Sequence, residues 1–456
     1  MSLISINPAT GEKIHSYKKH SSEEIKYILF QAEEEQLRWK NTFLEFRQSC
    51  LEQMAGILRD RSREYGILIT QEMGKPLSQS IAEIEKCAWL CDYYRGKAQE
   101  MLEDKTVEIT GQKSFISIQP IGLVLGVMPW NFPFWQVFRF AIPTITAGNG
   151  AILKHASNVQ GCAKAIEECF KVSGYPENIF KNLSISRIEV DEVIKNPSIA
   201  AVTLTGSISA GKSVAKAAGS VLKKTVLELG GSDPYVILED ADLDIALDAC
   251  ISGRLINAGQ SCIAAKRLIV TESIHDEYLM RLERKLCEKI VGDPMDDVDM
   301  GPMVSVTARD KLHSQILKAV HEGAELKLGG EIPEDDGAYY PLTLLSNVAP
   351  GNTVFDQEIF GPVFSVIKAK NEKEALSLAN QTEFGLGAAV FTNDKIKGEH
   401  IAKTQLQAGL CFVNDFVKSD PRLPFGGIKE SGYGRELASY GMMEFINLKT
   451  VVVKTG

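Results

Sequence analysis

The chain has 456 residues, of which 44% are hydrophobic and 24% charged, and its formal net charge is −9. This composition excludes an intrinsically disordered chain, and the length predicts two or three domains rather than a single core. The negative charge argues against nucleic-acid binding, because the neutralisation of phosphates requires clustered lysine and arginine.

The cysteines and the N-terminus indicate the compartment. Nine scattered cysteines do not form a disulfide framework, and no Cys or His cluster has the spacing of a zinc site. The first residues lack the basic and apolar regions of a signal peptide. We therefore expect a cytoplasmic protein without a bound metal. Between Lys113 and Lys154 the only charge is Arg139, yet prolines and glycines indicate a buried strand, turn and helix rather than a membrane span.

The N-terminal part of the chain is predicted to be mainly helical. Residues 1–20 are typical of a short hairpin around Thr10-Gly11, and Ser21-Ser22-Glu23-Glu24 has the form of a capping box that begins a long helical region. Helices are expected to continue to about Asp104, with a break near Gly74-Lys75-Pro76.

Strands and helices alternate after this region. Residues 115–127 are predicted to form two strands joined at Pro120. Such alternation predicts a parallel sheet built from βαβ units. The further strands are expected at 151–154, 199–204, 224–227 and 235–238, with helices at 162–172 and 211–222.

A second α/β set follows Asp240. The segment 342–361 is expected to be rich in loops. The last run, from Glu444 to Lys454, alternates like a strand and needs a covering partner in its own domain or in another subunit. The predicted helices of this set lie at 276–290 and 308–322, and its strands lie at 267–271, near 326, at 364–367 and at 388–391.

One cysteine lies at a break between elements. Gly259-Gln260-Ser261-Cys262 follows a helix predicted over 244–257 and precedes the strand at 267–271. A cysteine beside a glycine at such a break suits a presented, reactive thiol. Taken alone, a buried structural cysteine is the more common interpretation, so its neighbours in space have to decide.

Three further stretches carry candidate chemistry. Glu228-Leu229-Gly230-Gly231 follows a predicted strand, where a carboxylate can be poised rather than solvated. In Pro129-Trp130-Asn131-Phe132-Pro133, the asparagine amide can donate hydrogen bonds to a developing oxyanion. Residues 206–213 match the P-loop pattern of nucleoside triphosphate-binding proteins, and the weaker interpretation is a helix N-terminus that receives a nucleotide phosphate.

Seven motifs stand in one order along the chain, and in this order the chain resembles the aldehyde dehydrogenase superfamily. The resemblance runs from Asn7-Pro8-Ala9-Thr10-Gly11 to the C-terminal strand and covers essentially the whole chain. Each motif is weak alone, but the ordered set is specific and leaves the P-loop as a minor alternative. The motifs are Pro129 to Pro133, Lys154, Thr205-Gly206-Ser207 with Gly211, Glu228 to Gly231, Gly259 to Cys262, Glu358-Ile359-Phe360-Gly361-Pro362 and Pro424-Phe425-Gly426-Gly427.

The resemblance implies catalytic roles for four residues. Cys262 corresponds to the nucleophile whose thiolate attacks the aldehyde carbonyl. Asn131, with the backbone N–H of Cys262, corresponds to the oxyanion hole, and Glu228 to the base that activates water for thioester hydrolysis. Lys154 corresponds to a residue that holds the adenosine ribose and supports catalysis. Glu228 favours a free acid product, because coenzyme-A-acylating relatives lack a glutamate there.

The resemblance also implies the cofactor site. Glu358 corresponds to the carboxylate on the nicotinamide ribose, with Phe360 beside the ring, while Ser207 and Gly211 correspond to the pyrophosphate end. The complete expected site comprises Trp130, Lys154, Ser157, Gly206, Ser207, Gly211, Leu229, Glu358 and Phe360.

Ser157 bears on the choice of cofactor. Relatives restricted to NAD tend to carry glutamate at this position, three residues after the lysine, where it repels a 2′-phosphate. Ser157 is small and can donate a hydrogen bond, so NADP or NAD is expected as cofactor, with NADP slightly favoured.

Arg139 is the candidate for substrate selection, because a buried arginine should meet an anion. In succinate-semialdehyde dehydrogenases an arginine at this spacing binds the far carboxylate of the substrate, and the chain is similar to the shorter bacterial members of that group. An internal ion pair is the alternative for Arg139. The further candidates for substrate contact are Trp135, Ser419 and Arg422.

Two positions depart from the pattern of that group. Ile256 stands where some members carry a second arginine, so carboxylate recognition has to be completed elsewhere. Ala264 stands where some members carry a second cysteine, so no disulfide between neighbouring cysteines is expected at Cys262.

The resemblance implies an α/β fold of the aldehyde dehydrogenase type. A Rossmann-type cofactor-binding domain is expected over 1–111 and 128–231, and an α/β catalytic domain over 232–427. A β-strand oligomerisation arm is expected from 112–127 and 440–456. Because the arm strands need an edge to pair with, a homodimer or homotetramer is expected.

The leading functional hypothesis is NAD(P)-dependent oxidation of succinate semialdehyde to succinate through a Cys262 thiohemiacetal and thioester. Within the same class, the alternative is oxidation of another carboxylate-bearing semialdehyde, such as glutarate semialdehyde, or of a broad range of aliphatic aldehydes. From other classes, a P-loop ATPase and a catalytically silent binding protein remain as alternatives.

Overall fold

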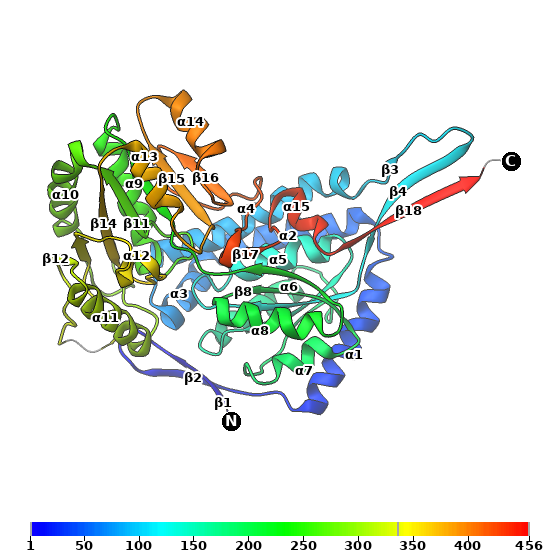
Figure 1. The fold of residues 1–456 in the computed structure, drawn as a ribbon. Coiled ribbons are helices and arrows are strands. Elements are labelled where there is room, and N and C mark those ends of the chain that lie inside the picture. The colour runs from blue at the N-terminus through cyan, green and yellow to red at the C-terminus, as the bar shows by residue number, and fades with distance from the viewer. Residues whose placement is uncertain (1, 335–336, 455–456) are drawn as a thin grey trace.

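The computed structural model describes residues 2–334 and 337–454, which fold into four β-sheets with helices packed around them (Figure 1). The predicted N-terminal hairpin is confirmed, since β1 (Ser2–Ile6) pairs antiparallel with β2 (Lys13–Lys18). Within these described ranges, no helix is long and apolar enough to cross a membrane.

Four consecutive helices follow, namely α1 (Ser22–Trp39), α2 (Leu44–Asp60), α3 (Ser62–Met73) and α4 (Leu77–Leu102). The predicted capping box begins α1, because the Ser21 hydroxyl accepts a hydrogen bond from the Glu24 N–H while the Glu24 carboxylate accepts one from the Ser21 N–H. Gly74 ends α3 in the left-handed conformation, with φ of 84°, which confirms the predicted break.

A six-stranded sheet contains the first βαβ set. Its strands are β5 (Leu123–Met128), β6 (Gly150–His155), β7 (Phe180–Asn182), β8 (Ile199–Thr205), β9 (Lys224–Glu228) and β17 (Gly432–Tyr433). Their order is β17-β9-β8-β5-β6-β7, and only β17 runs antiparallel to its neighbour. The five parallel strands have the Rossmann order. Successive strands are added on one side of β5 as far as β7, and from β8 onwards they are added on its other side. In such sheets, ligands bind at the carboxyl ends of the strands where this order switches, here between β5 and β8.

The connecting helices of this sheet fit the predicted alternation. Every residue of the helix after β5 is buried, and most of them are apolar. Helix α15 contacts it from the C-terminal part of the chain. These helices are α5 (Trp135–Thr146), α6 (Gln160–Val172), α7 (Val190–Lys195), α8 (Ile208–Gly219) and α15 (Ala438–Met443).

A seven-stranded sheet contains the second set. Its strands are β10 (Pro234–Ile237), β11 (Arg267–Thr271), β12 (Glu325–Leu328), β13 (Thr343–Ser346), β14 (Val363–Ala369), β15 (Gly387–Phe391) and β16 (Leu410–Val413). The order is β12-β13-β14-β11-β10-β15-β16, parallel except for β12. The strand β13 lies in the segment expected to be rich in loops, and its four residues are all buried.

Helices cover this second sheet as βαβ connections require. The predicted helices at 276–290 and 308–322 are present with earlier starts and ends, as α10 and α11. The helices are α9 (Leu243–Leu255), α10 (Glu272–Cys287), α11 (Val306–His321), α12 (Thr353–Asp356), α13 (Glu372–Asn380) and α14 (Lys395–Thr404).

A three-stranded antiparallel sheet projects from the body as an arm (Figure 1). It consists of β3 (Lys105–Thr106), β4 (Gln112–Pro120) and β18 (Ile446–Lys454), and β18 pairs with β4 along its whole length. The structure corrects the prediction that all of 112–127 belongs to the arm. The strand β5 is almost wholly buried and lies inside the six-stranded sheet, because its run of apolar side chains suits a strand covered on both faces.

A buried ion pair joins α4 to the start of α5. Glu83 is 5% exposed and Lys75 is 1% exposed, and their side chains form a salt bridge. The other oxygen of Glu83 accepts hydrogen bonds from the Phe134 and Trp135 N–H groups at 2.8 and 2.9 Å. The carboxylate therefore satisfies both a buried cation and the free N–H groups of a helix terminus.

Replacing Glu83 should destabilise the protein. Glu83→Ala leaves Lys75 buried without a partner, and breaking such a pair costs about 3–5 kcal/mol. Calorimetry should show a clear decrease in Tm. Glu85→Ala is the matched control, because Glu85 lies on the exposed face of the same helix. A decrease no larger than that of the control would contradict this role.

Candidate active site

Cys262 lies between the 3-10 helix η1 (Ile256–Gly259) and β11, as predicted from the break in the sequence pattern. Three consecutive residues before it, Asn257, Ala258 and Gly259, have φ values of 55°, 52° and 72°. Two of these are not glycine, and left-handed conformations are costly for them. A Cβ at Gly259 would collide with the carbonyl group of Gly361, so only glycine fits. The nucleophile candidate therefore sits on a strained, closely packed turn.

Asn131 connects this turn to the six-stranded sheet. Its side-chain amide donates a hydrogen bond to the Gln260 backbone carbonyl at 3.1 Å, and its backbone carbonyl accepts one from the Asn257 side-chain amide at 2.7 Å. The Gln260 side chain accepts a hydrogen bond from the Val304 N–H at 2.9 Å. The structure thus brings Asn131 and the cysteine turn together, although 130 residues separate them in the chain.

Two cavities meet at Cys262. One has a volume of about 240 Å³ and is lined mainly by α4, α5 and the segment around Ser419. The other has a volume of about 360 Å³ and lies at the strand ends of the six-stranded sheet. Among the described residues, Cys262 alone lines both. The half-buried thiol is therefore accessible from two separate chambers.

The larger cavity coincides with the topological switch point. The chain leaves β5 through Trp130, leaves β8 through Gly206 and Ser207, and leaves β9 through Leu229. All four residues line the cavity, as the sequence predicts. The ends of neighbouring strands therefore converge on one chamber, the usual place of a dinucleotide in such sheets.

The start of α8 faces this chamber and suits a phosphate. Ser207 is the N-cap of α8 and accepts a hydrogen bond from the Ala210 N–H at 3.3 Å. Gly211 does not line the cavity, but a Cβ there would lie 2.6 Å from the Leu229 side chain. The glycine lets α8 approach the strand end closely, and a helix N-terminus favours an anion.

Glu358 and Phe360 line the same cavity. The Glu358 carboxylate accepts a hydrogen bond from the Gly231 N–H at 3.1 Å, and a Cβ at Gly230 would collide with it. Phe360 makes an edge-to-face contact with Trp130, with ring centroids 5.9 Å apart. A carboxylate, two aromatic rings and a helix N-terminus are the groups that a nicotinamide dinucleotide requires for its ribose, ring and phosphates.

Lys266 was not predicted, although it lies four residues after Cys262. Its ammonium donates a hydrogen bond to the Cys262 carbonyl at 2.6 Å and pairs with Glu358 at 3.1 Å. The side chain is 1% exposed. This lysine therefore links the cysteine turn to the carboxylate of the larger cavity.

Lys154 and Ser157 lie at the end of β6, one strand away from the switch point, and do not belong to the lining of the larger cavity. Burial lowers the pKa of Lys154. Next to it, His155 is fully buried and its Nε2 donates to the Pro133 carbonyl at 2.9 Å. Burial lowers the pKa of His155 to about 4, so the ring is a neutral bridge between this loop and the turn that carries Asn131.

Glu228 is 1% exposed at the end of β9, and neither of its carboxylate oxygens has a hydrogen-bond partner among the described residues. A Cβ at Gly426 would lie 2.6 Å from this carboxylate. Burial, followed by the neighbouring Glu436 carboxylate, raises the pKa of Glu228 well above its usual range. A buried, unpartnered carboxyl of this kind suits proton transfer better than structure.

Burial also dominates the state of the nucleophile candidate. It raises the pKa of the Cys262 thiol to about 12, against the opposing positive charges of Arg139 and Lys266. The negative charge of Glu228 contributes in the same direction as burial, which indicates that the two groups are close. Without a ligand, Cys262 is therefore a protonated thiol at neutral pH.

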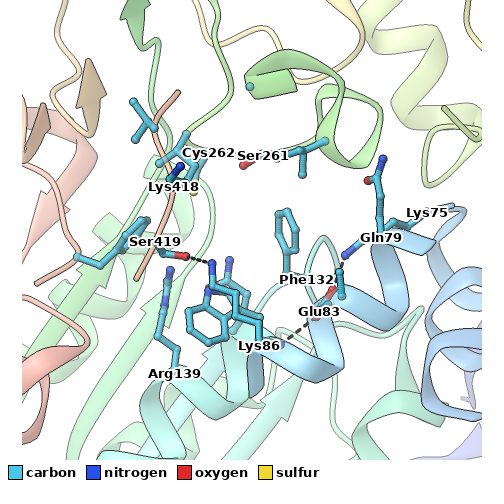
Figure 2. Close-up of a pocket in the computed structure, with 18 residues that line it drawn as sticks. Lys75, Gln79, Glu83, Lys86, Phe132, Arg139, Ser261, Cys262, Lys418 and Ser419 are labelled. Atoms are coloured by element: carbon cyan, nitrogen blue, oxygen red, sulfur yellow. Dashed lines mark hydrogen bonds and ion pairs between the residues drawn. The ribbon is translucent and has the colours of Figure 1, made fainter. Parts of the chain in front are cut away.

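Three of the four predicted substrate contacts line the smaller cavity, namely Trp135, Arg139 and Ser419. Figure 2 shows Arg139 and Ser419 on the wall of this cavity. Ile256, which replaces a possible second arginine, also lines it. Lys86 on α4 was not predicted, because nothing in its sequence neighbourhood marks it. It lines the cavity and donates a hydrogen bond to the Ser419 hydroxyl at 2.7 Å.

Both arginines that were predicted to bind the substrate are already paired with a carboxylate of the protein. Arg139 lines the smaller cavity, but it forms a buried ion pair with Glu436, which is the alternative that the sequence left open. Arg422, the fourth predicted substrate contact, does not line the cavity. Its guanidinium is exposed and held at 2.6 and 2.9 Å by Asp420, only two residues earlier.

The structure also bears on the P-loop alternative. The lysine of that pattern, Lys212, lies one turn into α8 and is exposed. Its ammonium forms a salt bridge with Glu430 at 2.7 Å. A P-loop lysine has to reach the phosphates, and this one is occupied on the helix surface.

Comparisons with known proteins agree with this geometry. The model of the Aldehyde dehydrogenase family matches residues 2–451. A probable succinate-semialdehyde dehydrogenase (NADP(+)) of Synechocystis sp. is 45% identical over 452 residues, 99% of each chain. The succinate semialdehyde dehydrogenase (NAD(P)+) Sad of Escherichia coli is 44% identical over 449 residues, which is 98% of this chain and 97% of the relative.

A solved structure has the same fold over the whole chain. The succinic semialdehyde dehydrogenase from Streptococcus pyogenes in complex with NADP+ has a TM-score of 0.97 at 36% sequence identity. The comparison covers 99% of this chain and 100% of that chain. The whole architecture, including the arm, is therefore shared.

The protonated state of Cys262 predicts a pH dependence. The rate of its alkylation by iodoacetamide should increase about tenfold per pH unit between about pH 6 and pH 9, because the thiolate fraction rises tenfold per unit below the pKa. Mass spectrometry of the peptide that contains Cys262 measures this rate separately from the other cysteines, with Cys262→Ser as the blank. An alkylation rate that reaches a plateau before the pH is raised to about 8 would show that the thiol is already ionised.

Proposed function

The chain belongs to the aldehyde dehydrogenase family, and from this premise we propose that it oxidises succinate semialdehyde to succinate with NADP+ or NAD+. The observation that carries the proposal is the meeting of two chambers at one thiol, a dinucleotide-type chamber at the sheet ends and a smaller chamber with basic side chains. The names of the relatives support the substrate, and the basic chamber suits an aldehyde that bears a carboxylate.

In this proposal Cys262 forms the covalent intermediates. Its thiolate attacks the aldehyde carbon, and the resulting oxyanion accepts hydrogen bonds from the Asn131 amide and the Cys262 N–H. The amide group of Asn131 has two hydrogens, so one can remain on the Gln260 carbonyl while the other reaches the oxyanion. A bound nicotinamide would favour ionisation of the thiol through its positive charge and would supply the acceptor for the hydride that leaves the thiohemiacetal carbon.

Glu228 completes the reaction by hydrolysis. The thioester on Cys262 needs an activated water, and Glu228 removes a proton from that water as it attacks the acyl carbon. A raised pKa suits this role, because a base is most effective when its pKa lies near the working pH. The carbon–sulfur bond then breaks, and the acid and the free thiol are released.

The cofactor contacts follow the same proposal. Glu358 would hold the nicotinamide ribose, with Phe360 beside the ring, and the α8 N-terminus with Ser207 would hold the diphosphate. Lys154 and Ser157 would contact the adenosine ribose at the end of β6. The absence of a carboxylate at Ser157 supports the use of NADP, the cofactor named for several of the relatives.

The chain is proposed to divide as the sequence suggests, with two shifts at the boundaries of the arm. The cofactor-binding part would be 1–104 and 123–231, the catalytic part 232–427, and the arm β3, β4 and β18. The arm leaves apolar side chains exposed, including Leu448 at 62%, Val452 at 49% and Val453 at 47%. Pairing through the β18 edge supports a homodimer or homotetramer. A monomeric mass by light scattering would contradict it.

The runner-up substrates are glutarate semialdehyde and neutral aliphatic aldehydes. The cavity volume alone does not distinguish them, because apolar walls accept either chain. Free cysteines throughout the chain support the expectation of a reducing cytoplasm as the site of the reaction.

Glu228→Gln tests the mechanism and the function together. Wild-type enzyme should oxidise succinate semialdehyde continuously. The variant should still transfer one hydride per active site, seen as a burst of reduced cofactor in stopped-flow absorbance, and then turn over about 100- to 10,000-fold more slowly, because an amide cannot activate water. Glu430→Gln, at a partly exposed position outside both cavities, should behave as wild type. A Glu228→Gln enzyme with unchanged steady-state turnover would refute the assigned role.

Ser157→Glu tests the cofactor assignment. The new carboxylate should repel the 2′-phosphate and lower kcat/KM for NADP+ by about tenfold or more, while kcat/KM for NAD+ changes little. Ser157→Ala is the matched control, since it removes the hydroxyl without adding charge. Steady-state kinetics with both cofactors measure the effect, and equal losses with NADP+ and NAD+ would count against Ser157 as the selecting residue.

A further inference from the structure

The charges around the smaller cavity are not equally available to a ligand. Four basic side chains line it, and three of them already have a carboxylate within ion-pair distance. The pairs are Lys75 with Glu83, Arg139 with Glu436, and Lys418 with Asp415. The fourth basic side chain is Lys86, and no carboxylate among the described residues forms an ion pair with it.

Lys86 is held in place without being neutralised. Its ammonium donates a hydrogen bond to the Ser419 hydroxyl at 2.7 Å and lies 4.5 Å from the centre of the Trp135 ring. The nearest acids are engaged elsewhere, since Glu83 pairs with Lys75 and Asp420 with Arg422. A half-buried cation whose charge is not compensated is costly, and a bound anion removes that cost.

The remaining wall of the cavity is mostly apolar. Phe132, Ile256, Val417 and Phe425 line it together with Cys262. A ligand for this chamber therefore needs an aldehyde for the thiol, an apolar middle and one negative charge. Figure 2 shows Lys86, Ser419 and Arg139 grouped on one wall of the cavity, with Cys262 above them.

We propose that Lys86, oriented by Ser419 and Trp135, binds the distal carboxylate of the aldehyde substrate and makes the enzyme specific for aldehydes that carry a carboxylate. This inference rests on the proposed oxidation of succinate semialdehyde. Arg139 lies on the same wall, but Glu436 already neutralises its charge. The recognition that cannot come from Ile256 is supplied from α4.

The surroundings of Lys86 give the proposal a pH signature. The charged or titratable groups that face it are Arg139 from α5, Asp420 and Lys418 from the segment beside Ser419, and Glu83 and Cys87 from its own helix. Burial, followed by the charge of Arg139, lowers the pKa of Lys86 to about 8. Lys86 is therefore charged below about pH 8, and its attraction for a carboxylate decreases above that pH.

Kinetics with a matched pair of aldehydes test this inference. Succinate semialdehyde and butanal have the same number of carbons, and only the former carries a carboxylate. Lys86→Met should lower kcat/KM for succinate semialdehyde by about 100-fold, mainly through KM, as expected when one partner of a buried charged pair is removed. The value for butanal should stay within about threefold. Lys86→Arg should restore most of the preference.

The controls separate the possible failures. Lys97→Met, on an exposed part of the same helix, should leave the preference unchanged. In the wild type, the ratio of the two kcat/KM values should decrease above about pH 8, and in Lys86→Arg it should not. Wild-type enzyme without any preference for succinate semialdehyde would contradict the proposed function. A wild-type preference that survives in Lys86→Met, or equal losses on both aldehydes, would overturn the role of Lys86 alone.

Discussion

The hydrogen bonds between Asn131 and the turn before Cys262 join the two large sheets where the chemistry is proposed to occur. Asn131 follows β5 of one sheet, whereas the turn precedes β11 of the other. Each sheet alone offers half a site, because one supplies the dinucleotide-type chamber and the other supplies the thiol. The left-handed backbone at Asn257 and Ala258 is tolerated because these bonds and the close packing at Gly259 fix it.

Around this junction, buried charges are arranged in pairs. Lys75 with Glu83, Arg139 with Glu436 and Lys266 with Glu358 neutralise one another out of water. Glu228 and Lys86 do not belong to such a pair. Glu228 has no hydrogen-bond partner among the described residues, and Lys86 has only a hydroxyl. These are the two groups to which proton transfer and anion binding are assigned.

Much of this site could be predicted from the sequence because its parts lie at the ends of strands. Cys262, Asn131, Glu228 and Ser207 each follow or precede a recognisable element, and glycines beside them mark close approaches of the backbone. Lys86 could not be predicted, since it lies in the middle of a long helix. Only its hydrogen bond to Ser419, which is far away in the sequence, places it at the cavity. Likewise, the sequence did not reveal that Asp420 binds Arg422 locally. The predicted arm extended into β5 because only Ile121 and Gly122 separate that strand from β4.

The two chambers share a single lining residue, Cys262, among the described residues, and this arrangement affects the binding and release of ligands as well as the reaction. In the proposed function, a carboxylate-bearing aldehyde would occupy the chamber beside α4, whereas a dinucleotide would lie against the ends of β5, β8 and β9. Neither ligand has to pass through the space of the other on its way out. The order in which acid and reduced cofactor depart is therefore decided by how tightly each is held, and not by one of them blocking the exit of the other.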